Sequence, residues 1–269
     1  MKIYMNEKEI IVNEDKTLFE LRNEHHETSD IWIYNGFPVK SDQQLNENDH
    51  IFFIKRGVIP SEEEFEQALV SRHTPGVHEL VKKSSVGIAG LGGLGSNIAI
   101  MLARIGIGKL VLVDFDVVEP SNLNRQQYFI KHLGLLKTEA IKQILEEVNP
   151  FIEVEIVNQY VDKTNVSDIF SEVDIIVEAF DGAESKAMLV NTVLHDMKEK
   201  YIVAASGLAG YYSNNTIKTK RITDKFYLVG DDISEAKPGS GLMAPRAALA
   251  ASHQANTVLR IIMGELEVE

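Results

Sequence analysis

A short apolar run leads directly into a turn that contains four glycines. Residues 86–89 have the composition of a buried strand, and the sequence GLGGLG follows at 90–95. Gly90 permits a tight turn, Gly92 lets the backbone approach a phosphate, and Gly95 allows a helix to pack close to the strand. The helix that begins here also offers free N–H groups to an anion. The pattern therefore predicts nucleotide contacts at Gly90, Gly92, Gly93 and Gly95, against the alternative of a structural turn without a ligand.

After this turn the chain alternates between strand-like and helix-like segments. The expected strands are 86–89, 110–113, 152–157, 173–178 and 201–205, and the expected helices lie near 96–105, 137–147, 183–197 and 245–263. Such alternation predicts an α/β fold with a doubly wound, Rossmann-like and mainly parallel sheet. Two further β-rich runs within 210–230 predict a few antiparallel additions.

The first 60 residues have a different rhythm. Their order is β-β-α-β-β, with strands at 2–5, 8–12, 31–34 and 51–55 and a helix opened by the capping box Thr17–Glu20. Four strands crossed by one helix bury this pattern economically. A second capping box at Ser61–Glu64 predicts a helix that runs to about Arg72. We expect a small domain at 1–58, linker helices at 59–84 and the large domain at 85–269.

Composition excludes several classes of function. A net charge of −13 makes nucleic acid and anionic membranes unlikely as general partners. The chain has no cysteine, which rules out disulfides, a cysteine zinc site, a thiolate nucleophile and a thioester intermediate. With no signal-like or membrane-spanning run, the sequence predicts a cytoplasmic protein.

A polar tail follows the second expected strand. Asp114, which lies 19 residues after Gly95, ends that strand, where an acid can accept hydrogen bonds from ribose hydroxyls. A loop-initiating aspartate is the alternative, and an NAD-dependent dehydrogenase fits the pattern equally well up to this residue. Asp116 and Ser121 belong to the same tail and complete this set of candidate contacts.

Donors further along the tail favour a triphosphate over a redox cofactor. Asn122, Arg125 and Gln126 can donate hydrogen bonds to phosphate oxygens, and Lys137 can add a point charge at the next helix. Offsetting phosphate charge is what chemistry at an α-phosphorus requires. The alternative for Arg125 and Lys137 is two solvated surface cations.

A further acid stands at the end of another expected strand. Asp181 follows the apolar run 173–179, and in a doubly wound sheet that end of the strand faces the ligand crevice. Mg²⁺ binds through few carboxylates together with phosphate oxygens, so Asp181 is the candidate metal ligand. A plain cap for the following helix is the alternative.

Together these motifs resemble the ThiF/MoeB-type adenylyltransferases, bacterial relatives of ubiquitin-activating enzymes. The resemblance covers about 86–264 and rests on GLGGLG, on DFD at 114–116, on SNLNRQ at 121–126 and on EAFD at 178–181. It implies adenylation of the C-terminal glycine carboxylate of a ubiquitin-like sulfur carrier, using ATP and Mg²⁺ and releasing pyrophosphate. Positioning and charge stabilisation would then carry the catalysis.

The resemblance also implies roles for individual residues. Gly92 would back the nucleotide and Asp114 its ribose, while Asn122, Arg125, Gln126 and Lys137 would hold phosphates and Asp181 the metal. It further implies a homodimer in which an arginine from an N-terminal helix reaches the neighbouring subunit, and Arg72 is the candidate. The catalytic candidates are thus Arg72, Arg125, Lys137 and Asp181. A cation at the C-terminal end of its helix is the alternative for Arg72.

Three departures from the family pattern narrow the implied chemistry. The two Cys-x-x-Cys pairs that hold zinc in many relatives are missing, so no zinc is expected. Without cysteine the product should stop at the acyl-adenylate, and a separate sulfur-donor protein should deliver sulfur. Gly182 stands where relatives often have asparagine, so the residue after the candidate metal ligand differs from the family pattern.

The strand order of residues 1–56 resembles the β-grasp (ubiquitin-like) fold of ThiS-type sulfur carriers. A carrier needs a free Gly-Gly carboxylate, whereas this segment continues through Arg56-Gly57-Val58-Ile59-Pro60. We expect a fused domain used for docking, oligomerisation or regulation, or one that merely packs on the core. The ThiS-like domain favours a carrier of thiamine synthesis. The alternatives are a related enzyme that adenylates another carboxylate or a tRNA substrate, an NAD-dependent oxidoreductase, and a nucleotide-binding scaffold.

Overall fold

The computed structural model describes residues 1–268, which form two compact units, Met1–His78 and Glu79 onward. The N-terminal unit is a β-grasp fold, as expected. Its strands are β1 (Lys2–Met5), β2 (Lys8–Ile11), β3 (Ile31–Tyr34), β4 (Phe37–Val39) and β5 (His50–Ile54), in the order β2-β1-β5-β3-β4. β1 and β5 are parallel, and the other neighbours are antiparallel. Helix α1 (Leu18–His25) adds Leu18 and Leu21 to a core that includes Ile3, Ile51 and Phe53.

The sequence correctly predicted the helix caps of this unit but missed one of its strands. The Thr17 hydroxyl accepts a hydrogen bond from the Glu20 amide, and the Glu20 carboxylate accepts one from Thr17, which is the predicted capping box. The expectation of four strands is wrong, because β4 adds a fifth at the edge. Only three residues long and containing Pro38, β4 lacks a clear strand signature, and proline is tolerated there because an edge strand has unpaired N–H positions. Helix α2 (Glu62–Val70) begins at the Ser61 cap and ends before Arg72.

The second unit is built on a seven-stranded sheet. Its strands are β6 (Ser85–Ala89), β7 (Lys109–Val113), β8 (Glu153–Val157), β9 (Ile175–Glu178), β10 (Tyr201–Ala205), β11 (Lys218–Arg221) and β12 (Phe226–Gly230), in the order β11-β12-β10-β9-β6-β7-β8. All neighbours pair in parallel except β11 with β12. The doubly wound prediction is confirmed. The few antiparallel additions expected within 210–230 reduce to β11 alone among the described residues.

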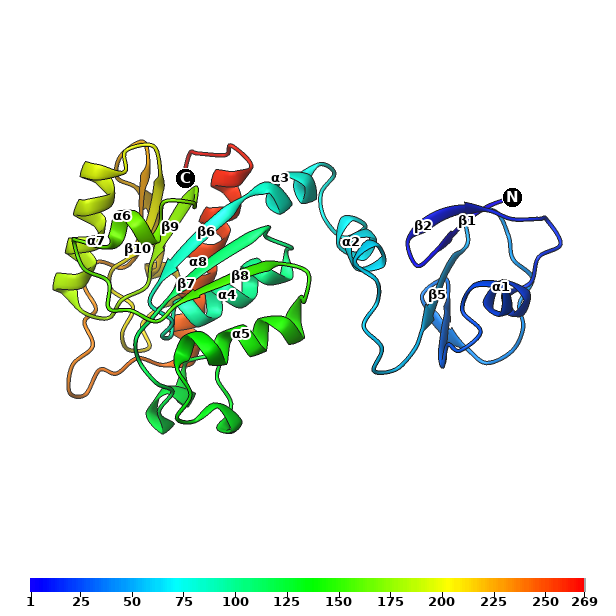
Figure 1. The fold of residues 1–269 in the computed structure, drawn as a ribbon, viewed down its shortest axis with the longest axis horizontal. Coiled ribbons are helices and arrows are strands. Elements are labelled where there is room, and N and C mark those ends of the chain that lie inside the picture. The colour runs from blue at the N-terminus through cyan, green and yellow to red at the C-terminus, as the bar shows by residue number, and fades with distance from the viewer. Residues whose placement is uncertain (269) are drawn as a thin grey trace. The chain divides into compact units, whose positions relative to one another are not determined.

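Helices cover both faces of this sheet (Figure 1). On one face α4 (Gly95–Arg104) packs between α5 (Lys137–Val148) and α8 (Ala244–Ile262). On the other, α6 (Val166–Ile169) and α7 (Ala183–Asp196) contact each other over a core that includes Phe170. Helix α3 (Val77–Lys83) precedes β6, and short 3-10 turns lie at Pro120–Asn124, Ile130–His132 and Asn214–Thr216. In residues 1–268 no helix combines the length and apolarity needed to span a bilayer.

The order of the strands indicates where in the sheet a ligand would bind. The chain runs from β6 through β7 to β8 at one edge, then returns to β9 on the other side of β6. The switch point therefore lies between β6 and β9. Ligands of doubly wound sheets bind outside the carboxyl ends of the strands at such a point.

Candidate functional site

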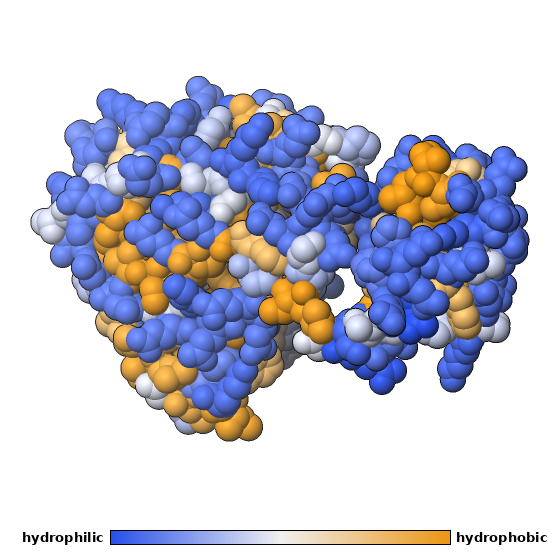
Figure 2. All heavy atoms as spheres, turned by 45° about the vertical axis from the view of Figure 1, so that its right-hand side comes forward, coloured by the Kyte–Doolittle hydropathy of each residue, from blue (hydrophilic) through white to orange (hydrophobic). Residues whose placement is uncertain are grey.

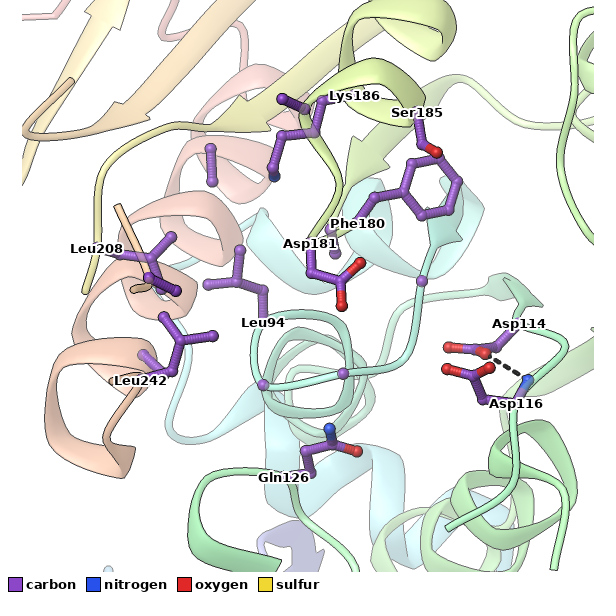
Figure 3. Close-up of a pocket in the computed structure, with 18 of the residues that line it drawn as sticks. Leu94, Asp114, Asp116, Gln126, Phe180, Asp181, Ser185, Lys186, Leu208 and Leu242 are labelled. Carbon is purple, nitrogen blue, oxygen red and sulfur yellow. Dashed lines mark hydrogen bonds between the residues drawn. The ribbon is translucent and has the colours of Figure 1, made fainter. Parts of the chain in front are cut away.

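A cavity of about 510 Å³ lies at the carboxyl ends of β6, β7, β9 and β10 (Figure 3). The glycine turn forms its floor, together with the ends of the neighbouring strands and the loops after them. Those loops include residues 205–209 and 234–236. Most of the site residues predicted from the sequence line this cavity. They are Gly90, Gly92, Gly93, Asp114, Asp116, Arg125, Gln126, Lys137 and Asp181.

Two glycines of the turn are required by the backbone itself. Gly90 has a φ of +92°, and a Cβ there would lie 2.8 Å from the carbonyl oxygen of Ala179. A Cβ on Gly95 would lie only 1.9 Å from the carbonyl oxygen of Gly90, and Gly95 does not line the cavity. Gly92 does line it, and its Cβ would meet nothing closer than the Gln126 amide nitrogen at 3.8 Å. The turn thus separates glycines needed for the fold from one that keeps space for a ligand.

This separation gives a matched pair of substitutions. We expect Gly95→Ala to destabilise the protein by more than about 2 kcal/mol, because strand and helix must move apart to admit the methyl group. Gly92→Ala should leave stability within about 0.5 kcal/mol and weaken ATP binding, because its methyl group enters the cavity. Urea denaturation and calorimetric titration with ATP measure the two effects. Equal stability losses in both variants would contradict this division.

Tyr128 and Asp114 hold the turn in place. The Leu91 amide donates to Oδ2 of Asp114 at 2.7 Å, and the Tyr128 hydroxyl donates to the Leu91 carbonyl at 2.8 Å. Oδ1 of Asp114 accepts a second bond, from the Asp116 amide at 2.9 Å (Figure 3). Burial raises the pKa of the Tyr128 phenol well above its ordinary value, so the phenol stays a donor. Asp114 therefore fixes the backbone of the glycine turn, a role that the sequence did not reveal. Its contact with ribose stays a prediction.

Lys137 is buried at the start of α5. Its ammonium lies 2.7 Å from Oδ2 of Asp116 and 4.0 Å from Oδ2 of Asp114. This geometry excludes the alternative of a solvated surface cation. The ammonium is held at the cavity wall beside two carboxylates, where it can meet an anionic ligand as a fixed point charge.

Arg125 and Gln126 both line the cavity, and each keeps one buried polar atom without a partner among residues 1–268. The Arg125 guanidinium donates to the Ser121 carbonyl at 3.3 Å and to Oδ1 of Asn124 at 2.8 Å. Its Nε and the Oε1 of Gln126 are buried without a hydrogen-bond partner within residues 1–268. The Gln126 side chain is 7% exposed, and its amide nitrogen lies beside Gly92. Buried polar atoms are rarely left unpaired in native proteins, so these two atoms are exceptions beside the cavity.

Besides Gly95, three of the predicted residues are not among those that line the cavity. Asn122 turns its side chain into its own 3-10 turn, where Oδ1 accepts from the Glu119 amide at 3.1 Å. The Ser121 hydroxyl lies 3.4 Å from the Glu119 carboxylate. Arg72 belongs to the N-terminal unit, where its guanidinium is mostly exposed and lies 3.5 Å from Oε1 of Glu7.

Asp181 follows β9 and points into the cavity (Figure 3). The alternative of a helix cap does not hold, because the N-cap position of α7 is Gly182 and no side chain caps it. Within residues 1–268 no hydrogen bond or ion pair engages the Asp181 carboxylate, and no cluster of three or more acidic, histidine or cysteine side chains offers a complete metal site. A Mg²⁺ ion here would take most of its ligands from phosphate and water, which is how this ion binds nucleotides.

Sequence reasoning missed an ion pair in the cavity wall. Glu178 is fully buried as the last residue of β9, and Lys186 lines the cavity from α7. The Lys186 ammonium lies 3.0 Å from both oxygens of Glu178. An acidic residue that ends an otherwise apolar strand was the available signal.

The fold defines a protein of the doubly wound α/β class with a glycine-lined cavity at its switch point, and sequence comparison adds the family. The pattern of the ThiF family matches residues 66–269, and that of the ThiS-like ubiquitin family matches residues 1–57. The chain belongs to the ThiF family and carries a ThiS-like domain at its N-terminus.

Characterised relatives match parts of the chain. The Haemophilus influenzae molybdopterin-synthase adenylyltransferase is 37% identical over 129 residues, which are 48% of this chain and 53% of that protein. The adenylyltransferase and sulfurtransferase UBA4 of Candida glabrata is 30% identical over 191 residues, 68% of this chain and 43% of that one. The ubiquitin-like modifier-activating enzyme 5 of Caenorhabditis briggsae is 34% identical over 143 residues, 49% of this chain and 32% of that one. The alignments thus span about a third to a half of these relatives.

Solved structures share the fold. The Escherichia coli tRNA N6-threonylcarbamoyladenosine dehydratase TcdA, in complex with AMP, superposes with a TM-score of 0.68 over 78% of this chain and 99% of that one, at 21% identity. Escherichia coli MccB with ATP superposes with a TM-score of 0.56 over 76% of this chain and 63% of that one, at 25% identity. At the first of these identities the likeness concerns the fold alone.

Proposed function

We propose that this protein uses MgATP to adenylate the C-terminal glycine carboxylate of a ubiquitin-like sulfur carrier, with release of pyrophosphate. One observation carries the proposal. Lys137, Arg125, Gln126 and the unengaged Asp181 carboxylate surround a single cavity on a ThiF-family fold. Family membership also favours an adenylyltransferase over an NAD-dependent oxidoreductase.

The reaction needs positioning more than it needs a protein nucleophile. A substrate carboxylate oxygen would attack the α-phosphorus, and the bond to the pyrophosphate oxygen would break. Arg125, Gln126 and Lys137 would hold the phosphates, and Asp181 would hold Mg²⁺, which when bound offsets their negative charge. Asp114 and Asp116 would face the ribose.

An aromatic pair suits the base end of the nucleotide. Phe115 and Tyr160 both line the cavity, and their rings lie 5.2 Å apart in an edge-to-face arrangement. They are 55% and 56% exposed, so each has a free surface to offer a flat heterocycle. We therefore place adenine against this pair.

The carrier would be a separate chain. Gly57 of the ThiS-like domain adopts a left-handed φ of +70° and continues into Val58, so the domain as given offers no glycine carboxylate. Because the chain has no cysteine, sulfur would come from a separate donor protein. The ThiS-like domain favours a ThiS-type carrier of thiamine synthesis. A homodimer in which Arg72 acts on the neighbouring subunit's site is part of the same proposal.

ATP–pyrophosphate exchange tests the function and the carrier together. The assay compares a ThiS-type carrier, a molybdopterin-synthase carrier, a tRNA pool and each carrier truncated by its last two glycines. We expect exchange with the ThiS-type carrier, none with truncated proteins, and none with tRNA because of the net charge of −13. Exchange with none of these substrates, despite ATP binding, would overturn the proposal.

Arg125 supplies a second check within the same assay. Arg125→Ala should lower exchange by at least about tenfold, because a donor aimed at the phosphates is lost. Arg104→Ala, on the last turn of α4 and outside the cavity lining, is the matched control and should retain exchange. An unchanged rate in Arg125→Ala would remove this residue from the site.

A further inference from the structure

Glu178 is a fully buried acidic residue in the middle of the large sheet, a position where carboxylates are rarely found. It ends β9, the strand that pairs with both β6 and β10 in the middle of the sheet. An isolated carboxylate at such a position is strongly unfavourable, so its partners must compensate for the loss of water. Burial raises the pKa of Glu178, and the adjacent Lys186 ammonium opposes that rise.

The partners of Glu178 belong to three segments of the cavity wall. Oε1 accepts from the Phe180 amide at 2.7 Å, in the turn that leads to Asp181. Oε2 accepts from the Ala205 amide at 3.3 Å, where β10 passes into the 206–209 loop. Both oxygens accept from the ammonium of Lys186, which belongs to α7, at 3.0 Å. The Lys186 side chain is 23% exposed. One carboxylate therefore joins the ends of β9 and β10 to α7.

The consequence falls on Asp181. The Glu178–Phe180 hydrogen bond spans only two residues and fixes the backbone immediately before Asp181. The Asp181 side chain has no partner of its own in the part of the chain that the structure describes. Figure 3 shows Asp181 reaching into the cavity between Lys186 and the glycine turn. Because Lys186 balances the charge of Glu178, the pair does not add a second anion beside a triphosphate.

We propose that Glu178 and Lys186 form a positioning pair that sets the direction of the Asp181 carboxylate and so governs the binding of metal-loaded nucleotide. The inference rests on the proposed role of Asp181 in the nucleotide site. It assigns the pair no contact with the reacting atoms. It also predicts that nucleotide without metal binds almost independently of the pair.

Calorimetric titrations of the full chain test this with three probes: ATP with MgCl₂, ATP in EDTA, and AMP. The measured quantity is the gain in ATP affinity that magnesium provides. We expect Glu178→Gln and Lys186→Met to lower this gain by about tenfold, the lower end of what groups that orient metal ligands contribute, while AMP affinity stays within about twofold. Lys186→Arg, which keeps a cation facing Glu178, should restore most of the gain.

Two further variants make the test decisive. Asp181→Asn alone should abolish the gain in ATP affinity that magnesium provides. Adding Glu178→Gln to this variant should lower the affinity for ATP with magnesium no further, because the pair acts through Asp181. Asp174→Asn is the matched control: its carboxylate holds Ser85 just before β9 begins, far along the strand from the cavity. It should alter the urea midpoint and leave the gain intact.

Each contrary result has a definite meaning. If Glu178→Gln weakens AMP and MgATP equally, or shifts only the urea midpoint, the pair is structural and the inference is wrong. If Lys186→Met loses the gain but Glu178→Gln keeps it, lysine acts directly on the nucleotide and the positioning role is excluded. These titrations need no carrier protein, so a failure of pyrophosphate exchange, which tests the proposed function, stays distinguishable from a failure here.

Discussion

Replacing Asp181 with asparagine is expected to lower ATP–pyrophosphate exchange by roughly a hundredfold or more, the scale on which single groups that stabilise transition-state charge operate. The substitution keeps the size of the side chain, replaces one acceptor oxygen by an amide donor and removes one negative charge. Since the carboxylate has no partner among residues 1–268, its loss should barely change the free energy of unfolding. AMP should bind normally, because the phosphate donors and the glycine turn are untouched.

Asp168→Asn is the matched control for this experiment. Asp168 is exposed on α6, does not line the cavity, and undergoes the same change of charge. Exchange should be followed as a function of magnesium concentration, and we expect the asparagine variant at position 181 to need far more metal for its residual rate. If Asp181→Asn exchanges at the normal rate and the normal magnesium concentration, the metal-ligand assignment is wrong.

The core of the fold was predictable because its signals are local. The apolar runs and glycine spacing located β6, β7, β8 and β10 to within a residue or so, and β9 to within two. The β4 edge strand was not predictable, because three residues that include Pro38 carry too little pattern. The direction of β12 also escaped prediction: a strand's pairing partner depends on the return path of the chain and not on its own composition.

The candidate site shows the same limit. The rule that ligands meet the carboxyl ends of parallel strands predicted a common edge for Asp114 and Asp181, and both line one cavity together with Lys137 at the start of α5. It did not indicate which residues of the 3-10 turn at 120–124 would face inward, because such a short turn has no useful periodicity. Asn122 therefore looked like a phosphate donor, although its side chain is used within the turn. Nor did spacing reveal that Glu178 and Lys186 would pair.

Substitution of Arg246 is expected to produce the largest loss of stability among the variants considered. Replacing it with leucine should lower the free energy of unfolding by about 3–5 kcal/mol, as for other buried charges left without their partner. Its guanidinium, near the start of α8, is buried and donates to Oδ2 of Asp231 at 2.6 Å and to Oγ1 of Thr216 at 2.9 Å. It also donates to the carbonyls of Tyr212 and Ser213. One side chain thus ties α8 to the segment before β11 and to the segment after β12.

Arg260→Leu is the matched control, because this exposed arginine on the last turn of the same helix donates to a single group among residues 1–268, the Glu267 carbonyl at 2.8 Å. Its loss should stay below about 1 kcal/mol. Amide hydrogen exchange should show faster opening of residues 206–213 and 231–243 in Arg246→Leu and not in the control. Uniformly faster exchange across the whole sheet would contradict a loop-anchoring role.

The pH dependence of this loss has a definite sign. Burial by itself would raise the pKa of Asp231, but hydrogen bonds from the Ser234 hydroxyl and amide, the Ile233 amide and Arg246 outweigh it and bring the pKa to about 2. A folded-state pKa below the unfolded value of about 3.9 means that the ionised carboxylate stabilises the protein above that pH and loses this effect as the pH falls toward 2.

In Arg246→Leu the remaining carboxylate is left buried without its cation, so acid should relieve the defect by protonating it. The stability difference between wild type and variant should therefore stay constant from about pH 8 to pH 5 and shrink below about pH 4 in urea denaturation series. A difference that stays constant down to pH 3 would show that the loss arises from packing and not from the stranded charge.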